Sequence, residues 1–332
     1  MSQPLLNIDD LHVHFNTSDG VVKAINGASL TLNPGEIVGL VGESGSGKSV
    51  TAMSILGLVP KPPAIYPKGR ILWKGIDLLT TPDAELREIR GGEISMIFQD
   101  PMTSLNPVYT IGHQISEMIR VHERISAKAA KVRAIEMLNL VGVPKSEQRV
   151  DDYPHQFSGG MRQRAMIAMA LSCNPELLIA DEPTTALDVT IQAQILEILE
   201  KSARELNVAV LLITHDLGVV AGICDRVAVM YGGRIVEEAS VDNLFERPLM
   251  PYTWGLMKSI PQMYEFSTDP LYTIPGAPPV MSRPPKGCAF APRCEFAVEK
   301  CHNEVPILEE FEEGRMVRCH RVKEANFVQV LK

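Results

Sequence analysis

The sequence predicts an α/β fold with a parallel sheet covered on both faces by helices. Short apolar runs at 177–180 and 208–213 alternate with segments of helical periodicity at 164–171 and 191–205. Such continuous apolar runs are typical of parallel strands that are buried on both faces. A third apolar run, Ile37–Val41, leads into a glycine-rich loop and a further helical segment. Strands that alternate with helices in this way build a doubly covered sheet.

The chain is expected to have a main domain over 5–256 and an extension over 257–332. The opening of the main domain, to about residue 100, is rich in strand patterns, and residues 108–150 carry apolar residues at helical spacing. We therefore expect a strand-rich N-terminal subdomain and a helical subdomain at about 103–163. The extension holds four of the six cysteines. Its many prolines and few periodic apolar positions predict a small separate appendage without a large core of its own, which burial alone would not fold and a metal centre could stabilise.

Composition narrows the class of partner. The formal net charge is −8 and no block of Lys or Arg stands out, which argues against nucleic acid as a partner. The apolar runs are far shorter than the roughly 20 residues that span a bilayer. The first residues, MSQPLLNIDD, lack the pattern of a signal peptide. We expect a soluble chain, so any membrane spans would come from another subunit.

The loop after the third apolar run fits the phosphate-binding pattern G-x-x-x-x-G-K-[ST]. It consists of Gly42, Glu43, Ser44, Gly45, Ser46, Gly47, Lys48 and Ser49. Its glycines let the backbone curve around an anion, and the helix that follows adds positive potential at its N-terminus. Lys48 would reach the β- and γ-phosphates, and Ser49 would bind Mg²⁺. The alternative is a glycine-rich turn without a ligand.

Two acids, Asp181 and Glu182, end the apolar run at 177–180. An acid at the carboxyl end of a strand beside a phosphate loop can hold the Mg²⁺ shell, the role we expect for Asp181. Glu182 could polarise a water for attack on the γ-phosphorus. A solvated acidic turn is the alternative for this segment.

A second anion-binding site is predicted at the N-terminus of a helix, which begins with Ser158, Gly159 and Gly160. A hydroxyl group and bare N–H groups lie there at the positive end of the helix dipole. One chain cannot easily bring both loops to the same triphosphate.

With these motifs the sequence resembles the nucleotide-binding subunits of ATP-binding-cassette (ABC) transporters, over about residues 5–260. The ordered set of markers specific to that family is the loop at 42–49, Gln99, the signature at 158–163, Asp181-Glu182, Ala186-Leu187-Asp188 and His215. The resemblance implies a P-loop NTPase cassette with a RecA-like core. It also implies a head-to-tail dimer in which the loop of one chain and the signature of the other clamp each ATP.

The resemblance also implies roles for single residues. Gln99 would contact Mg²⁺ and the attacking water, Glu182 would be the general base and His215 would hold the γ-phosphate. Asp188 would act across the dimer interface, and Val50 would complete the loop's ATP contacts. His215 could instead be only a neighbour of a helix cap.

Two positions fit the family pattern less closely. Phe15 resembles the aromatic residue that stacks on adenine, although a core aromatic on an early strand is the alternative. The usual signature is LSGGQ, whereas this chain has FSGGM, with Gln163 two places later. Because the Ser-Gly-Gly that touches phosphate is intact, we expect function to survive.

Two segments are similar to the peptide and nickel importer branch of this family: FQDPMTSLNP at 98–107 and Pro-Tyr-Thr at 251–253. Within that branch the chain most resembles the D-type subunits of dipeptide/oligopeptide permeases. The resemblance implies an ATPase that powers peptide import from the cytoplasmic face of the cell membrane. Its partners would be a second cassette (a copy or a paralogue), two membrane-spanning permease subunits and an extracytoplasmic peptide-binding protein. The alternatives are nickel or another small solute, a soluble ABC ATPase outside transport, and a P-loop enzyme that phosphorylates or ligates a small substrate.

The four cysteines of the extension, Cys288, Cys294, Cys301 and Cys319, match positions that bind a [4Fe–4S] cluster in this branch. Their C-x5-C-x6-C-x17-C spacing lacks the C-x2-C pairs of many zinc modules. This favours the cluster over Zn²⁺ or unligated thiols. His302 and His320, each next to a cysteine, are possible substitute ligands.

Overall fold

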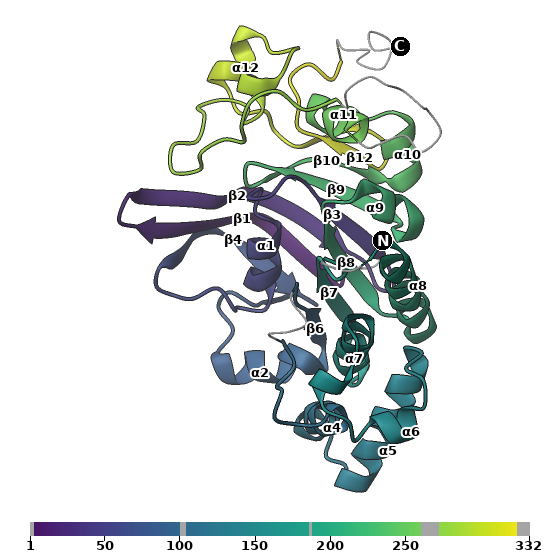
Figure 1. Cartoon of the computed structure of the whole chain (residues 1–332). Coiled ribbons are helices and arrows are strands. Elements are labelled where there is room, and N and C mark those ends of the chain that lie inside the picture. Colours follow the sequence, from purple (N-terminus) through teal and green to yellow (C-terminus); the bar gives the residue numbers. More distant parts are fainter. Residues whose placement is uncertain (1–2, 100–103, 186–187, 260–271, 324–332) are drawn as a thin grey trace. The chain divides into compact units, whose positions relative to one another are not determined.

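The computed structural model describes residues 3–99, 104–185, 188–259 and 272–323 (Figure 1). The chain forms two compact units, each made from separate stretches of sequence. The first unit is built mainly from Thr80–Ile213 together with Leu32–Ile37. The second contains Leu6–Thr31, Val38–Leu79 and the chain from Thr214 onward.

Parallel strands form the centre of the first unit, in the order β8 (Ala209–Thr214), β7 (Leu177–Asp181), β6 (Ile94–Ile97). Every residue of β7 and β8 is buried, as expected for strands covered on both faces. The expected α/β class and both central strands are therefore confirmed. Each of β7 and β8 runs one residue beyond its apolar run, to Asp181 and Thr214.

The expected helical region also forms in the first unit. Hydroxyl groups begin two of its helices, because Thr110 accepts a hydrogen bond from the backbone N–H of His113 and Ser126 accepts one from Ala129. The helices of this unit are α2 (Asp83–Gly92), α4 (Ile111–His122), α5 (Ala127–Leu140), α6 (Ser146–Arg149), α7 (Gly159–Leu171) and α8 (Val189–Leu206), with a 3-10 turn at Pro154–Gln156.

The second unit contains two sets of strands. One is a sheet in the order β2 (Gly20–Leu32), β1 (Leu6–Thr17), β4 (Ala64–Trp73), β5 (Ile76–Asp77). The other runs in the order β11 (Glu309–Glu312), β12 (Arg315–Val317), β10 (Arg234–Ser240), β9 (Arg226–Tyr231), β3 (Ile37–Val41). Its helices are α1 (Lys48–Ile55), α9 (Leu217–Ile223), α10 (Val241–Glu246), α11 (Pro251–Lys258) and α12 (Glu299–Asn303), with a 3-10 turn at Ala291–Arg293. Among the described residues, no helix combines the length and apolar character needed to cross a bilayer.

The C-terminal extension shares a core with the rest of the second unit. Strand β12 pairs antiparallel with β10 (Figure 1). Phe290 packs on Tyr231 of β9 and Tyr252 of α11, with ring centroids 5.3 and 5.4 Å away. We had expected a separate appendage without a large core of its own. Its apolar residues instead complete a cluster that begins on β9 and β10.

One acid is fully buried in this shared region. Glu237 of β10 is 0% exposed, and its carboxylate accepts hydrogen bonds from the backbone N–H groups of Leu249 (2.6 Å) and Met250 (2.9 Å), just before α11. The guanidinium of Arg315 lies 3.9 Å away. Burial raises the pKa of Glu237 to about 7, because it penalises the charged form more than these partners favour it.

This raised pKa predicts a pH dependence of stability. The ordinary pKa of a glutamate is 4.5, so between about pH 4.5 and 7 the folded chain binds the proton more tightly than the unfolded chain. The contribution of Glu237 to stability is therefore present at low pH and is lost as the pH rises through about 7. Between pH 5 and 8, the melting temperature of the wild type should fall by roughly 2–4 °C relative to Glu237→Gln.

Thermal unfolding across this pH series measures the difference. The exposed Glu310 of β11 provides a control, because Glu310→Gln should retain the pH dependence of the wild type. A constant gap between the wild type and Glu237→Gln at every pH would contradict the assignment.

Candidate functional site

The glycine-rich loop of the second unit packs its backbone directly against neighbouring strands. Gly42 has φ of 152°, and a Cβ there would lie 2.2 Å from the carbonyl oxygen of Met230 on β9. Gly47 has φ of 111°, and a Cβ there would lie 2.8 Å from the carbonyl oxygen of Ala24 on β2. Both positions therefore need glycine, for the left-handed conformation and for the close approach.

The lysine of the loop is buried and turned back onto the loop. Lys48 is 6% exposed, and its Nζ donates to the carbonyl oxygens of Gly42 (2.7 Å) and Glu43 (3.0 Å). Lys48 is the first residue of α1, and Ser49 and Val50 follow in its first turn, half-buried. The ammonium group and the N-terminal N–H groups of α1 thus lie at one end of the helix, an arrangement suited to a phosphate chain.

Two residues far along the chain hold this loop and were not found from the sequence. The hydroxyl group of Tyr252 on α11 accepts a hydrogen bond from the backbone N–H of Glu43 (2.8 Å). Arg293 of the extension binds the Glu43 carboxylate. Burial raises the pKa of Tyr252 well above its usual range, so the group stays a neutral hydroxyl. Separations of 209 and 250 residues explain why no local pattern revealed these contacts.

In the first unit the acid pair lies at the carboxyl end of β7. Asp181 is the last residue of the strand and is 6% exposed. Glu182 follows with φ of 47°, a left-handed conformation that is uncommon outside glycine. Backbone strain of this kind concentrates at functional sites, where surrounding contacts maintain it.

The side chain of Glu182 is held by two partners. Its Oε2 accepts hydrogen bonds from Gln99 Nε2 (3.0 Å) and from Thr185 Oγ1 (2.8 Å). The structure therefore brings Gln99 and Glu182 into direct contact. No motif in the sequence pointed to Thr185. Residues 100–103, after Gln99, and 186–187, before Asp188, lie outside the described residues.

The signature segment and Asp188 line one open groove in the first unit. Ser158 is the N-cap of α7, and its Oγ accepts a hydrogen bond from the N–H of Met161 (3.4 Å). Ser158 and Gly159 are exposed, and Asp188 is exposed at the start of α8. Gln163 is only 1% exposed, so it does not replace the usual signature glutamine at the surface, where Met161 stands instead.

His215 and Phe15 lie in the second unit. His215 is exposed and follows β8, and the next residue, Asp216, caps α9 by accepting from Gly218 N (2.8 Å) and Val219 N (3.3 Å). His215 is therefore next to the cap without providing it. Phe15 is half-buried near the end of β1, opposite Ala64 of β4.

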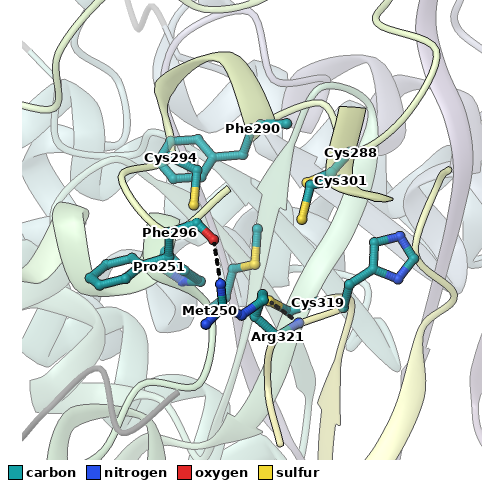
Figure 2. A pocket seen from close by; sticks show the side chains of 11 residues that line it. Met250, Pro251, Cys288, Phe290, Cys294, Phe296, Cys301, Cys319 and Arg321 are labelled. Atoms are coloured by element: carbon teal, nitrogen blue, oxygen red, sulfur yellow. Dashed lines mark hydrogen bonds between the residues drawn. The ribbon is translucent and has the colours of Figure 1, made fainter. Parts of the chain in front are cut away.

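All four cysteines of the extension line one pocket (Figure 2). Cys288 and Cys294 flank the turn at Ala291–Arg293, Cys301 lies on α12, and Cys319 follows β12. The N–H of Cys288 donates to the carbonyl oxygen of Cys301 (2.8 Å), which joins two of the segments. The four thiols form no disulfide.

Burial penalises the thiolate form of three of these cysteines, Cys288, Cys294 and Cys319, and so raises their pKa. Burial raises the pKa of Cys294 to about 11 and that of Cys319 to about 12, so both stay protonated unless a cation is bound. In the described parts of the chain, no group of three or more His, Cys, Asp or Glu residues is arranged to hold a metal ion. His302 is exposed and does not line the pocket, whereas His320 lines it and hydrogen-bonds through Nε2 to the carbonyl oxygen of Glu304 (3.0 Å).

Comparisons with protein families give two matches in this chain. The family described as "ABC transporter" matches residues 25–185, which include the glycine-rich loop, Gln99, the signature and the acid pair. The family described as "Oligopeptide/dipeptide transporter, C-terminal region" matches residues 236–301, which include three of the four cysteines.

Curated relatives match over nearly the whole chain. The chain is 52% identical over 96% of its length to a probable peptide ABC transporter ATP-binding protein of Sinorhizobium fredii, of which it covers 96%. It is 54% identical over 89% of its length to the oligopeptide transport ATP-binding protein OppD of Bacillus subtilis, of which it covers 82%. It is 51% identical over 95% of its length to OppD of Haemophilus influenzae, of which it covers 97%.

A solved structure agrees with the fold. The dimeric post-hydrolysis structure of the ATP-binding cassette MJ0796, bound to ADP and Pi, matches with a TM-score of 0.64 and 27% identity. The match covers 71% of this chain and 98% of that one. With the loop, the acid pair and the signature in place, the chain belongs to the ABC transporter family, as an ATP-binding subunit of its oligopeptide/dipeptide branch.

Proposed function

We propose that this chain hydrolyses ATP to power the import of dipeptides or oligopeptides through separate membrane subunits. The observation that carries this proposal is the pair of family matches in one chain, a cassette followed by the C-terminal region of oligopeptide/dipeptide transporters. The curated relatives named for peptide transport support the same substrate class. An importer of nickel or another solute built on the same branch is the alternative.

The proposed roles follow the chemistry of each residue. Lys48 would bind the β- and γ-phosphates, and Ser49, Gln99 and Asp181 would be the ligands of Mg²⁺, which would supply positive charge to the phosphates. Glu182 accepts a proton from the attacking water, and its hydrogen bond to Gln99 supports this assignment. His215 contacts the γ-phosphate, and Phe15 stacks on adenine.

The remaining ATP contacts would come from a second cassette, a copy or a paralogue. The signature Ser158, Gly159 and Gly160 of each chain would face the phosphates bound by the other. Two features support this: the exposed start of α7, and the groove that the signature shares with Asp188. The solved relative is likewise dimeric. Two permease subunits and a peptide-binding protein would complete the importer, placing this chain at the cytoplasmic face of the membrane.

We also propose that the chain divides functionally into a nucleotide-binding domain at 5–256 and a C-terminal extension at 257–332. In the extension, the four cysteines would hold a [4Fe–4S] cluster. The support is that all four thiols line one pocket although they come from separate segments. When bound, such a cluster would take one thiolate ligand from each of the four cysteines. Zn²⁺ remains the alternative.

The base assignment predicts the behaviour of Glu182→Gln. This variant should bind ATP nearly as well as the wild type, while its turnover falls by roughly 10²–10⁴-fold, the usual contribution of positioned proton transfer. Peptide uptake by cells should fall with turnover. ATPase assays on the assembled importer and uptake of labelled dipeptides by deletion cells carrying the variant measure both effects.

A matched control is Glu176→Gln, which changes an exposed acid just before the other end of β7 and should leave turnover unchanged. Full turnover in Glu182→Gln would remove Glu182 from the mechanism. Normal peptide uptake in cells that lack the chain would remove peptide import as its function.

The shared-site assignment predicts that Ser158→Arg abolishes hydrolysis at the partner's loop, because a bulky cation blocks the approach of the other γ-phosphate. Its own loop should still bind nucleotide, measured by titration of the isolated chain. Ala129→Arg adds the same cation at an exposed position of α5 and should be harmless. Hydrolysis by isolated monomers at the assembled rate would contradict a shared site.

The cysteine assignment predicts about four irons per chain, and broad absorption near about 400 nm, after anaerobic purification. Cys301→Ser should lose the iron and loosen the extension while nucleotide binding persists. Cys173→Ser, outside the extension, should retain the iron. Metal analysis that finds about one zinc and no iron would exclude the cluster and leave a four-thiolate zinc site.

A further inference from the structure

A buried arginine of the C-terminal extension binds the acid inside the phosphate loop. Arg293 Nη1 lies 2.7 Å from Glu43 Oε2, and Arg293 Nη2 lies 3.1 Å from Glu43 Oε1. The side chain of Arg293 is 5% exposed and that of Glu43 is 25% exposed. Two parallel bonds of this kind form the strongest common geometry for a guanidinium and a carboxylate.

Every N–H of this guanidinium has an acceptor. Besides the two bonds to Glu43, Nε donates to the carbonyl oxygen of Pro275 (2.9 Å), Nη1 to Tyr231 Oη (3.2 Å) and Nη2 to the carbonyl oxygen of Ile274 (3.3 Å). A guanidinium has five N–H donors in a fixed plane, and this environment uses all five. The pKa of Arg293 is raised above its usual range, mainly by its hydrogen bonds to the carboxylate of Glu43.

The negative charge of Glu43 is unfavourable at its position in the phosphate loop. It follows the first glycine of a loop whose N–H groups and Lys48 attract a triphosphate, so an unpaired carboxylate there would repel the same ligand. The contact with Arg293 cancels this charge and fixes the side chain. Tyr252 fixes the backbone of the same residue through its N–H.

The position of Arg293 depends on the fold of the extension. Arg293 ends the 3-10 turn at Ala291–Arg293, and the backbone N–H groups of Ala291 and Cys294 donate to the carbonyl oxygens of Cys288 and Ala291 (3.0 and 3.3 Å). Phe290, just before the turn, packs on Tyr231 and Tyr252. Any change that unfolds this turn would also remove the cation from Glu43.

We propose that Arg293 is a positioning residue for ATP binding: it neutralises Glu43 and holds the phosphate loop, so that the loop's affinity for ATP depends on the folded C-terminal extension. This inference rests on the proposed function only in that the loop binds ATP. A wild-type chain that fails to bind ATP would contradict that function, whereas the comparison among variants tests Arg293 alone.

The test measures the dissociation constant for Mg-ATP on the purified full-length chain by calorimetric titration. Arg293→Gln leaves Glu43 unpaired and should weaken binding by about tenfold, the effect of one partly screened charge near the ligand. Arg293→Lys keeps the charge and should stay within about threefold of the wild type. In the assembled importer, Arg293→Gln should raise KM and spare kcat.

The decisive variant is the double mutant Glu43→Gln/Arg293→Gln. Removing the unpaired carboxylate should recover most of the affinity that Arg293→Gln loses. A merely structural contact predicts the opposite, a double mutant that binds no better than Arg293→Gln. The latter result would overturn the proposal, as would equal affinities of the Gln and Lys variants.

The matched control is Arg247→Gln. Arg247 also pairs with an acid of the extension, Glu312, but this pair is half-exposed and lies outside the phosphate loop. Its ATP affinity should equal that of the wild type. Thermal unfolding without nucleotide shows whether Arg293→Gln folds. If it does not, Arg293→Met is used instead, because methionine has an aliphatic volume similar to that of the arginine stem. A Met variant that binds ATP as tightly as Arg293→Lys would overturn the proposal.

Discussion

The close backbone packing of the glycine-rich loop is the constraint on which the second unit depends. At Gly42 and Gly47 the loop lies so near the carbonyl groups of β9 and β2 that no Cβ fits at either position. The loop is therefore placed by backbone contact with two strands, and α1 begins directly after it. A phosphate-binding loop needs its N–H groups pre-oriented, because ordering them on binding would cost affinity. Packing against strands provides that order in advance.

A second constraint acts on the acid pair of the first unit. Glu182 takes a left-handed backbone conformation, and its N–H donates to the carbonyl oxygen of Ile213 (2.9 Å) at the end of β8. The strand pairing thus holds the backbone, while Gln99 and Thr185 hold the carboxylate. In the role proposed for Glu182, a base fixed at both its backbone and its side chain would lose little entropy when it orients a water. The bond to Gln99 also means that movement of either residue changes the position of the other.

The sequence predicted features that depend on local pattern and missed those that depend on distant contacts. Strands β7 and β8 were predictable because a doubly buried strand needs an apolar run, and the start of α7 because Ser158 caps it. The place of the glycine-rich loop, between β3 and α1, was predictable because phosphate-binding loops need certain residues in a fixed order. The bonds from Glu43 to Tyr252 and Arg293 carry no such local signal, since one tyrosine or arginine in an irregular segment looks like any other.

The stability of the C-terminal extension also depends on distant contacts, because its apolar residues are buried against other parts of the chain. Its prolines and sparse apolar residues suggested a segment that burial alone could not fold, which motivated a metal centre. The structure shows part of the missing stability elsewhere, in Phe290 packed on Tyr231 and Tyr252 and in β12 hydrogen-bonded to β10. A metal centre would therefore add less to the fold of the extension as a whole than to the local turn at 288–301. Arg293 lies within that turn, so the proposed cluster would also steady the arginine that binds Glu43.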